Sequence, residues 1–200
     1  MSHSEAQPTL IGDHLALDFL NSRVSGNKEF ADWLDGDQNF LDWLLKVNIA
    51  DESILAAVKL NQQQRQLLVE QAKELRNWLE GFVSRLVAGN KAEHIDADIQ
   101  FINSLLSKDS CYAQIEGDYT ISNRRRWQSP ESLLQPIINA IADLICHVDP
   151  ELIKQCEAHN CILYFHDRTK AHKRRWCSMA ICGNRAKAAA NRARKAQSSQ

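Results

Sequence analysis

Apolar residues recur every three or four positions along much of the chain, which is the spacing expected of helices with one buried face. The longest such stretch covers residues 63–88 and is followed by Gly89-Asn90, a pair that commonly ends a helix. Its apolar stripe consists of Leu68, Ala72, Leu75, Leu79, Phe82, Val83 and Leu86. We therefore expect one long amphipathic helix in the middle of the chain.

Shorter stretches with the same spacing lie on both sides of this helix. Asp37 stands where an N-cap is expected, and Ser129-Pro130 is typical of an N-cap followed by the first helical residue. The stretches are LALDFLNS at residues 15–22, DQNFLDWLLKV at 37–47, ADIQFINSLLS at 97–107 and residues 130–145. The pattern predicts a mainly α-helical fold.

The segment CYAQIEGDYTISNRRRW, at residues 111–127, has a different pattern. Residues that favour β-strands flank Glu116-Gly117-Asp118, and their alternation fits two short strands joined by a tight turn. We therefore expect one short β-hairpin within the helical domain.

Asp149-Pro150 ends the last of these helices, and we place a domain boundary there. Residues 1–149 then form a helical domain, and residues 150–200 form a small C-terminal module. Charge supports this division, because residues 151–200 hold eleven Lys or Arg against three Asp or Glu, whereas the first 150 residues hold thirteen against twenty-two. A strongly basic segment of this kind favours polyanions as partners.

Four of the six cysteines lie in this module in the pattern C-x4-C-x15-C-x4-C, as Cys156, Cys161, Cys177 and Cys182. The module has few apolar residues, so a structural metal would supply what its core lacks. Zinc suits four thiolates because it is borderline-soft and takes tetrahedral geometry, and an iron–sulfur cluster is the alternative. We expect one zinc ion.

The remaining candidate ligands are assigned other roles. Cys111 and Cys146 have apolar neighbours in the sequence and are expected to pack as small hydrophobic side chains. His159, His166 and His172 lie between the cysteine pairs and could replace a ligand, but the set of four cysteines is already complete. We expect these histidines at the surface or in packing.

The beginning of the chain has no cationic segment followed by a long apolar run, and no stretch reaches the roughly 18 apolar residues that span a bilayer. We therefore expect a soluble, cytoplasmic protein without a membrane partner. Thiols stay reduced in that compartment, so the spaced cysteines are expected to bind a metal rather than to form disulfides.

The segments CEAHNC and LYFHDRTKAHKRRWCSMAICGNRAKAAANRAR resemble the CGNR zinc finger, which is named for the tetrapeptide at residues 182–185. The resemblance covers about residues 150–195 and includes a Phe-x-Asp element at Phe165 and Asp167. LALDFLNS similarly resembles the opening signature of the ABATE domain, which precedes the finger in that family. The resemblance implies a bacterial transcription regulator, acting under stress, with the finger as its nucleic-acid contact.

If one zinc ion joins the two cysteine pairs, the insert between them can form a short β-hairpin, and the chain after Cys177 enters a helix. This resembles a treble-clef arrangement. Nucleic acid, DNA rather than RNA, is the expected partner of the cations that zinc would organise. They are Arg174, Arg175, Arg185, Lys187, Arg192, Arg194 and Lys195.

The helical domain is expected to sense a ligand or to form a homodimer. His14 and Asp18 lie four residues apart and could share a helix face. They are either a structural pair or, together with Asn21, the rim of a ligand pocket. The alternative function is a zinc-stabilised protein-interaction module that binds no nucleic acid. A nuclease of the HNH type is disfavoured because His159 and Asn160 fall inside the first cysteine loop and no histidine follows Cys182. We therefore expect no catalytic residues.

Overall fold

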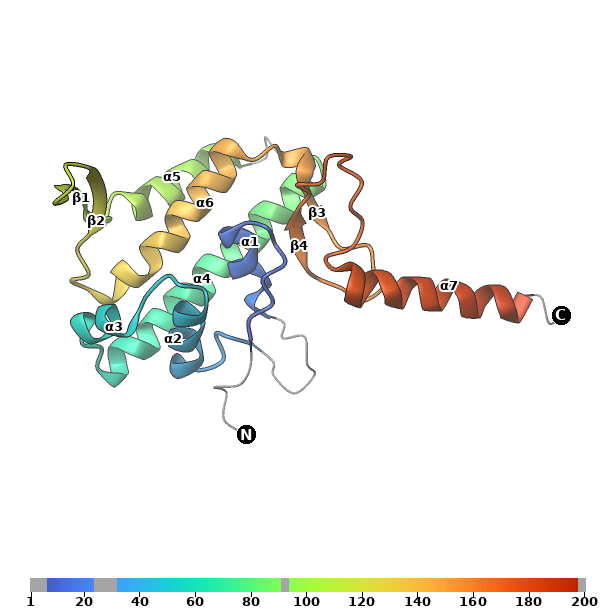
Figure 1. Cartoon of the computed structure of the whole chain (residues 1–200), viewed down its shortest axis with the longest axis horizontal. Helices are drawn as coiled ribbons and strands as arrows, with labels where there is room; N and C mark the ends of the chain where they lie inside the picture. The colour runs from blue at the N-terminus through green and yellow to red at the C-terminus, as the bar shows by residue number, and fades with distance from the viewer. Residues whose placement is uncertain (1–6, 24–31, 91–93, 198–200) are drawn as a thin grey trace.

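The computed structural model describes residues 7–23, 32–90 and 94–197 and is mainly α-helical, as predicted (Figure 1). The helices are α1 (Leu15–Leu20), α2 (Asp37–Lys46), α3 (Glu52–Val58), α4 (Gln62–Val87), α5 (Ile95–Leu106), α6 (Gln135–His147) and α7 (Asn184–Gln197). The strands are β1 (Cys111–Ile115), β2 (Ile121–Arg125), β3 (Ile153–Gln155) and β4 (Tyr164–His166). We call α1 to α6 with the β1–β2 hairpin the body, and the segment from β3 to α7 the finger.

Helix α4 is the long helix that the apolar stripe predicts, and it begins one residue earlier than expected. Asn61 caps it by accepting a hydrogen bond from the Gln64 backbone N–H, and the Gln64 side chain accepts one from the Asn61 N–H. This reciprocal pair satisfies two backbone donors that a helix start otherwise leaves open. The predicted stripe is buried along α4 from Leu68 to Leu86.

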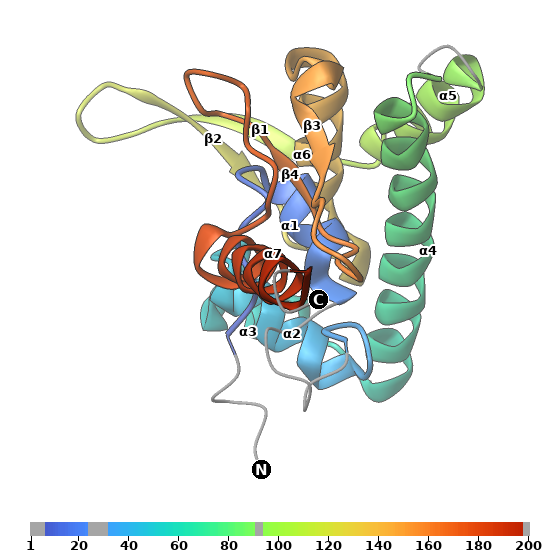
Figure 2. The same cartoon turned by 90° about the vertical axis from the view of Figure 1, so that its right-hand side faces the viewer.

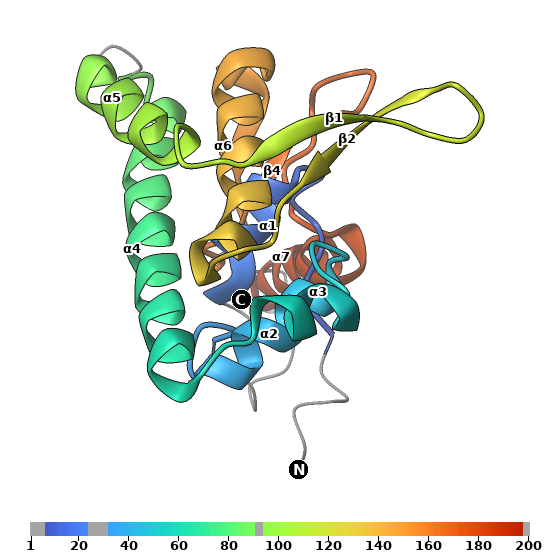
Figure 3. The same ribbon diagram turned by 90° about the vertical axis from the view of Figure 1, so that its left-hand side faces the viewer.

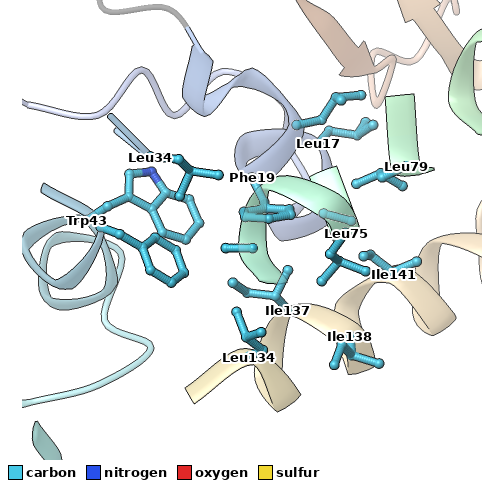
Figure 4. Close-up of a cluster of buried hydrophobic side chains, with 14 of the residues drawn as sticks. Leu17, Phe19, Leu34, Trp43, Leu75, Leu79, Leu134, Ile137, Ile138 and Ile141 are labelled. Carbon is cyan, nitrogen blue, oxygen red and sulfur yellow. The ribbon is translucent and has the colours of Figure 1, made fainter. Parts of the chain in front are cut away.

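The core of the body lies between α4, α1, α6 and α2 (Figure 4). Helix α1 contacts both α6 and α4. Figure 2 shows it next to α6, with α4 to the right. Ala16, Leu17 and Phe19 of α1 have no exposed surface. A helix of only six residues is unstable alone, and this burial is what holds it in place.

The starts of several helices differ in detail from the predictions. Gly36, with a φ of 116°, occupies the N-cap of α2, so Asp37 is the first helical residue rather than the cap. Residues Pro130–Leu134 form a 3-10 turn before α6, and the Ser129 side chain makes no capping bond. Helix α3 has no counterpart among the predictions, because Val58 is its only buried residue and its sequence has no clear stripe.

The predicted β-hairpin exists as β1 and β2, which pair antiparallel and project from the body (Figure 3). Most of its side chains are exposed, with Tyr119 at the turn 93% exposed. Cys111 lies on this hairpin and Cys146 lies on the outer side of α6, and both are exposed. The expectation that these two cysteines are buried among apolar residues is therefore wrong, since neighbours in the sequence are not neighbours in space here.

Strands β3 and β4 form a second antiparallel pair, which lies where the finger meets the body. The side chains of Ile153 and Tyr164 belong to the core of the body, whereas Phe165 belongs to the smaller core of the finger. Successive residues of β4 thus face opposite cores, because side chains along a strand point alternately to its two sides. Among the described helices, none is long and apolar enough to cross a membrane.

Candidate metal centre

The four predicted ligands come from two tight turns of the finger. Cys156 follows β3 and Cys161 closes the next turn, in which Asn160 has a φ of 64° and the Cys161 N–H donates to the Ala158 carbonyl at 3.0 Å. Cys177 and Cys182 lie on either side of Ser178, whose side chain caps a turn of π-helix at Met179–Gly183. That turn continues directly into α7.

This arrangement differs in one respect from the prediction. The hairpin does not lie within the 15-residue insert between the cysteine pairs, because β3 precedes Cys156 and only β4 lies in the insert. The hairpin therefore encloses the first cysteine pair, and the second pair lies at the start of the helical segment. A treble-clef-like finger with a hairpin and a following helix is present as expected.

The cysteine sulfurs form one compact cluster. All four lie within 4.8 Å of one another, with 3.8 Å between Cys161 and Cys177 and 3.5 Å between Cys177 and Cys182. Sulfurs placed about 2.3 Å from a central zinc ion at tetrahedral angles are separated by about 3.8 Å. The four residues therefore fit one zinc ion, and four protein ligands leave no open coordination position, as in a structural site.

The cluster is unfavourable for thiolates that have no cation between them. Burial raises the pKa of Cys161 to about 11 and raises the pKa of Cys177 further. Zinc binds the thiolate form, so its positive charge offsets the cost of removing these protons. The Cys177 N–H points to the Cys156 sulfur at 3.3 Å and stabilises negative charge there.

Asp167 organises the long insert between the cysteine pairs. It has no exposed surface, and its carboxylate accepts hydrogen bonds from Lys154 Nζ at 2.6 Å and from the backbone N–H groups of Thr169 and Arg174. Burial alone would raise the pKa of Asp167, but the hydrogen bonds from Lys154 and Thr169 hold it well below its usual range. The Phe-x-Asp element is the sequence signal for this residue, whose partners could not be predicted.

Arg174 is part of the framework of the finger. Its guanidinium lies 4.1 Å from the centre of the Phe165 ring, forms an ion pair with Asp13, and donates to the Cys177 carbonyl at 2.6 Å and the Ile11 carbonyl at 3.1 Å. Arg175 is more exposed and pairs with Glu157 at 2.6 Å. Both predicted nucleic-acid contacts before Cys177 are thus already engaged with carboxylates of this chain.

The predicted cations after Cys182 all lie on α7. Arg185, Lys187, Arg192, Arg194 and Lys195 are exposed. Figure 1 shows α7 extending from the metal centre away from the body. The three histidines of the finger are not part of the sulfur cluster: His159 and His172 are exposed, and His166 is partly buried on β4.

His14, Asp18 and Asn21 each have a partner in the structure. His14 caps α1 through the Ala16 N–H and lies 3.1 Å from Asp143. Asp18 accepts from the Gly12 N–H at 2.8 Å, and burial raises its pKa to about 6. Asn21 is buried and contacts the backbone of Tyr164. All three side chains therefore make contacts within the chain, and the predicted pocket rim stays a prediction.

Comparisons with known families agree with this architecture. The ABATE family model, described as "Putative stress-induced transcription regulator", matches residues 13–148, and the CGNR zinc finger model matches residues 153–195. No curated protein matches the chain. Neither family description names an enzyme.

Proposed function

The chain belongs to the ABATE family and ends in a CGNR zinc finger, and from this premise we propose that it regulates transcription by binding duplex DNA through α7. Residues 1–149 form the regulatory domain in this proposal, and residues 150–200 form the DNA-binding module. The zinc ion has a structural role, which is to fix the start of α7.

The observation that carries the proposal is the exposed and basic surface of α7. Its side chains from 187 to 195 are exposed, and five of the first twelve residues of the helix are Lys or Arg without an Asp or Glu among them. A helix of this length that packs on no core is marginal in water, even when rich in alanine. A polyanion lying along it would neutralise the repulsion between its cations and stabilise it.

The cations leave one side of α7 to small residues. Arg185 and Arg192 are seven residues apart and lie on one face, and Lys187 and Arg194 are related in the same way on another. The alanines between them keep the helix narrow. The B-form major groove, about 12 Å wide, admits such a helix, whereas the deep and narrow A-form groove of RNA does not.

A salt titration of DNA binding tests the proposal. We expect the zinc-loaded full chain to bind a duplex, with an affinity that falls with salt at a log–log slope of roughly −4 to −5, from about −0.9 for each of five phosphate contacts. Fluorescence anisotropy of a labelled duplex measures this slope. Replacing Lys195 with Ala should make the slope less steep by about one contact.

Two variants serve as controls in the same titration. Lys108→Ala removes an exposed lysine of the body and should bind like the wild type, and Arg185→Ala should weaken binding while one equivalent of zinc is retained. Binding that is unaffected by Arg185→Ala and Lys195→Ala, or no binding by the wild type at low salt, would refute the proposal. The protein-interaction function would then be the better description of the finger.

A further inference from the structure

We propose that Asn21 is a positioning residue: with Gly12 and Asp18 it fixes β4 of the finger against the body, so that zinc binding in the finger stabilises the body. We call these three residues and the backbone of β4 the joint. Two residues of the signature LALDFLNS, Asp18 and Asn21, then hold the finger against the body.

Asn21 makes the central contact of the joint. Its Nδ2 donates to the Tyr164 carbonyl at 2.8 Å, and its Oδ1 accepts from the Tyr164 N–H at 2.9 Å. The side-chain amide thus pairs with both polar backbone groups of one residue, as a neighbouring strand would. Asn21 is 3% exposed and Tyr164 is 7% exposed, so neither group could turn to water if the other were lost.

Gly12 and Asp18 hold the other end of the same strand. The Gly12 carbonyl accepts from the His166 N–H at 2.8 Å, while the Asp18 carboxylate fixes Gly12 by accepting from its N–H. A Cβ atom at position 12 would lie 2.8 Å from the Leu17 Cβ and 2.9 Å from the Asp18 backbone nitrogen. Only glycine lets the backbone approach α1 this closely.

Two further contacts join the same surfaces. The Tyr164 side chain completes the core of the body, and the Arg174 guanidinium connects Asp13 and the Ile11 carbonyl to the Cys177 carbonyl. Cys177 is a zinc ligand, so one side chain reaches from the segment before α1 to the metal site. Loss of zinc should therefore loosen contacts on which α1 depends.

The consequence is a two-way coupling between body and finger. If zinc binds more tightly when the joint is closed, then the joint closes more firmly when zinc is bound, by the reciprocity of linked equilibria. A ligand or second copy that shifts α1 would change the orientation of the finger by the same route. This regulatory step rests on the proposed function, whereas the coupling itself needs no nucleic acid.

The test compares melting temperatures of the full chain with zinc and after chelation by EDTA, followed by circular dichroism of the helical signal. In the wild type, we expect chelation to lower the melting temperature of the body by roughly 2 to 4 °C, which is the shift that about 1 kcal/mol causes in a domain of this size. In Asn21→Ala, the zinc-loaded protein should melt lower, and the additional shift on chelation should fall to less than half. A residue that only stabilised the body would leave the chelation shift unchanged.

The matched control is Asn139→Ala. The Asn139 side chain also makes two hydrogen bonds, to Asp109 and to the Gln135 carbonyl, but it lies on α6 away from the finger. This variant should keep the full wild-type chelation shift even if it melts lower. An Asn21→Ala protein with the full shift, or a wild type with none, would overturn the proposal.

Hydrogen exchange on the wild type decides the matter even if Asn21→Ala does not fold. Chelation should accelerate exchange of the amides in residues 15–21 by about tenfold or more, because opening of the joint exposes them. Exchange in α2, at Asp37–Lys46, should change much less. Equal exchange of residues 15–21 with and without zinc would refute the coupling. These experiments contain no DNA, so their failure is distinct from failure of the proposed function.

Discussion

The body buries large apolar side chains, including Phe19, Trp33 and Phe40 with no exposed surface, whereas three of the six buried residues in the core cluster of the finger are cysteines. Helices with long stripes can bury enough apolar surface to pay for the ordering of the chain. The finger cannot, and its fold depends on a metal and on the body beside it. The body is thus stabilised mainly by apolar burial and the finger mainly by metal binding. Different perturbations should therefore destabilise each part most.

The largest effect should come from loss of a zinc ligand. Cys182→Ser removes one of four thiolates, and structural zinc sites are worth about 10 to 16 kcal/mol of apparent binding free energy. We expect the zinc content to fall well below one equivalent and α7 to lose its helical signal. Cys146→Ser replaces an exposed cysteine outside the cluster and should keep one equivalent. Full zinc content in Cys182→Ser would contradict the assignment of the four ligands.

An intermediate effect is expected from a cavity in the body. Phe40→Ala removes a fully buried ring that stacks on Trp43, and substitutions of this kind cost about 3 to 5 kcal/mol. Urea unfolding should show a much lower midpoint, while the zinc content in the absence of urea stays at one equivalent. Tyr119→Ala on the exposed hairpin is the comparison and should change the midpoint little. Similar midpoints for both variants would mean that the core described here is not what holds the body.

The smallest effect concerns the charge of Asp18. Burial raises the pKa of Asp18 to about 6, above its value of about 4 in an unfolded chain. The stability that its protonated form contributes is therefore complete below about pH 4 and is lost as the pH rises through 6. Asp18→Asn keeps an oxygen that accepts from the Gly12 N–H and carries no charge at either pH. The urea midpoint of this variant should therefore exceed that of the wild type by more at pH 7.5 than at pH 5.

Urea midpoints at the two pH values measure this difference. Asp35→Asn, which changes an exposed carboxylate in the loop before α2, should show no such trend. If the midpoints of Asp18→Asn and the wild type differ by the same amount at both pH values, the charge of Asp18 does not affect the stability.

The parts that could be predicted from sequence are those set by local chemistry. The spacing of four cysteines is a property of the chain itself, and so are the apolar stripe of α4 and the turn between β1 and β2. Contacts between distant segments cannot be predicted in this way: the ion pair between Arg174 and Asp13 joins residues that lie 161 positions apart. For the same reason, the hydrogen bonds between Asn21 and Tyr164 could not be predicted, since 143 residues separate the two.

The joint also determines the order in which this protein can be completed during synthesis. Asn21 emerges early from the ribosome, but the backbone group that it binds lies 143 residues later. Until Tyr164 is made, the core of the body lacks this side chain, and the side-chain amide of Asn21 has no β4 backbone to bind. A nascent chain that stops after α6 therefore presents an incomplete core, and the finger that completes it leaves the ribosome after the body.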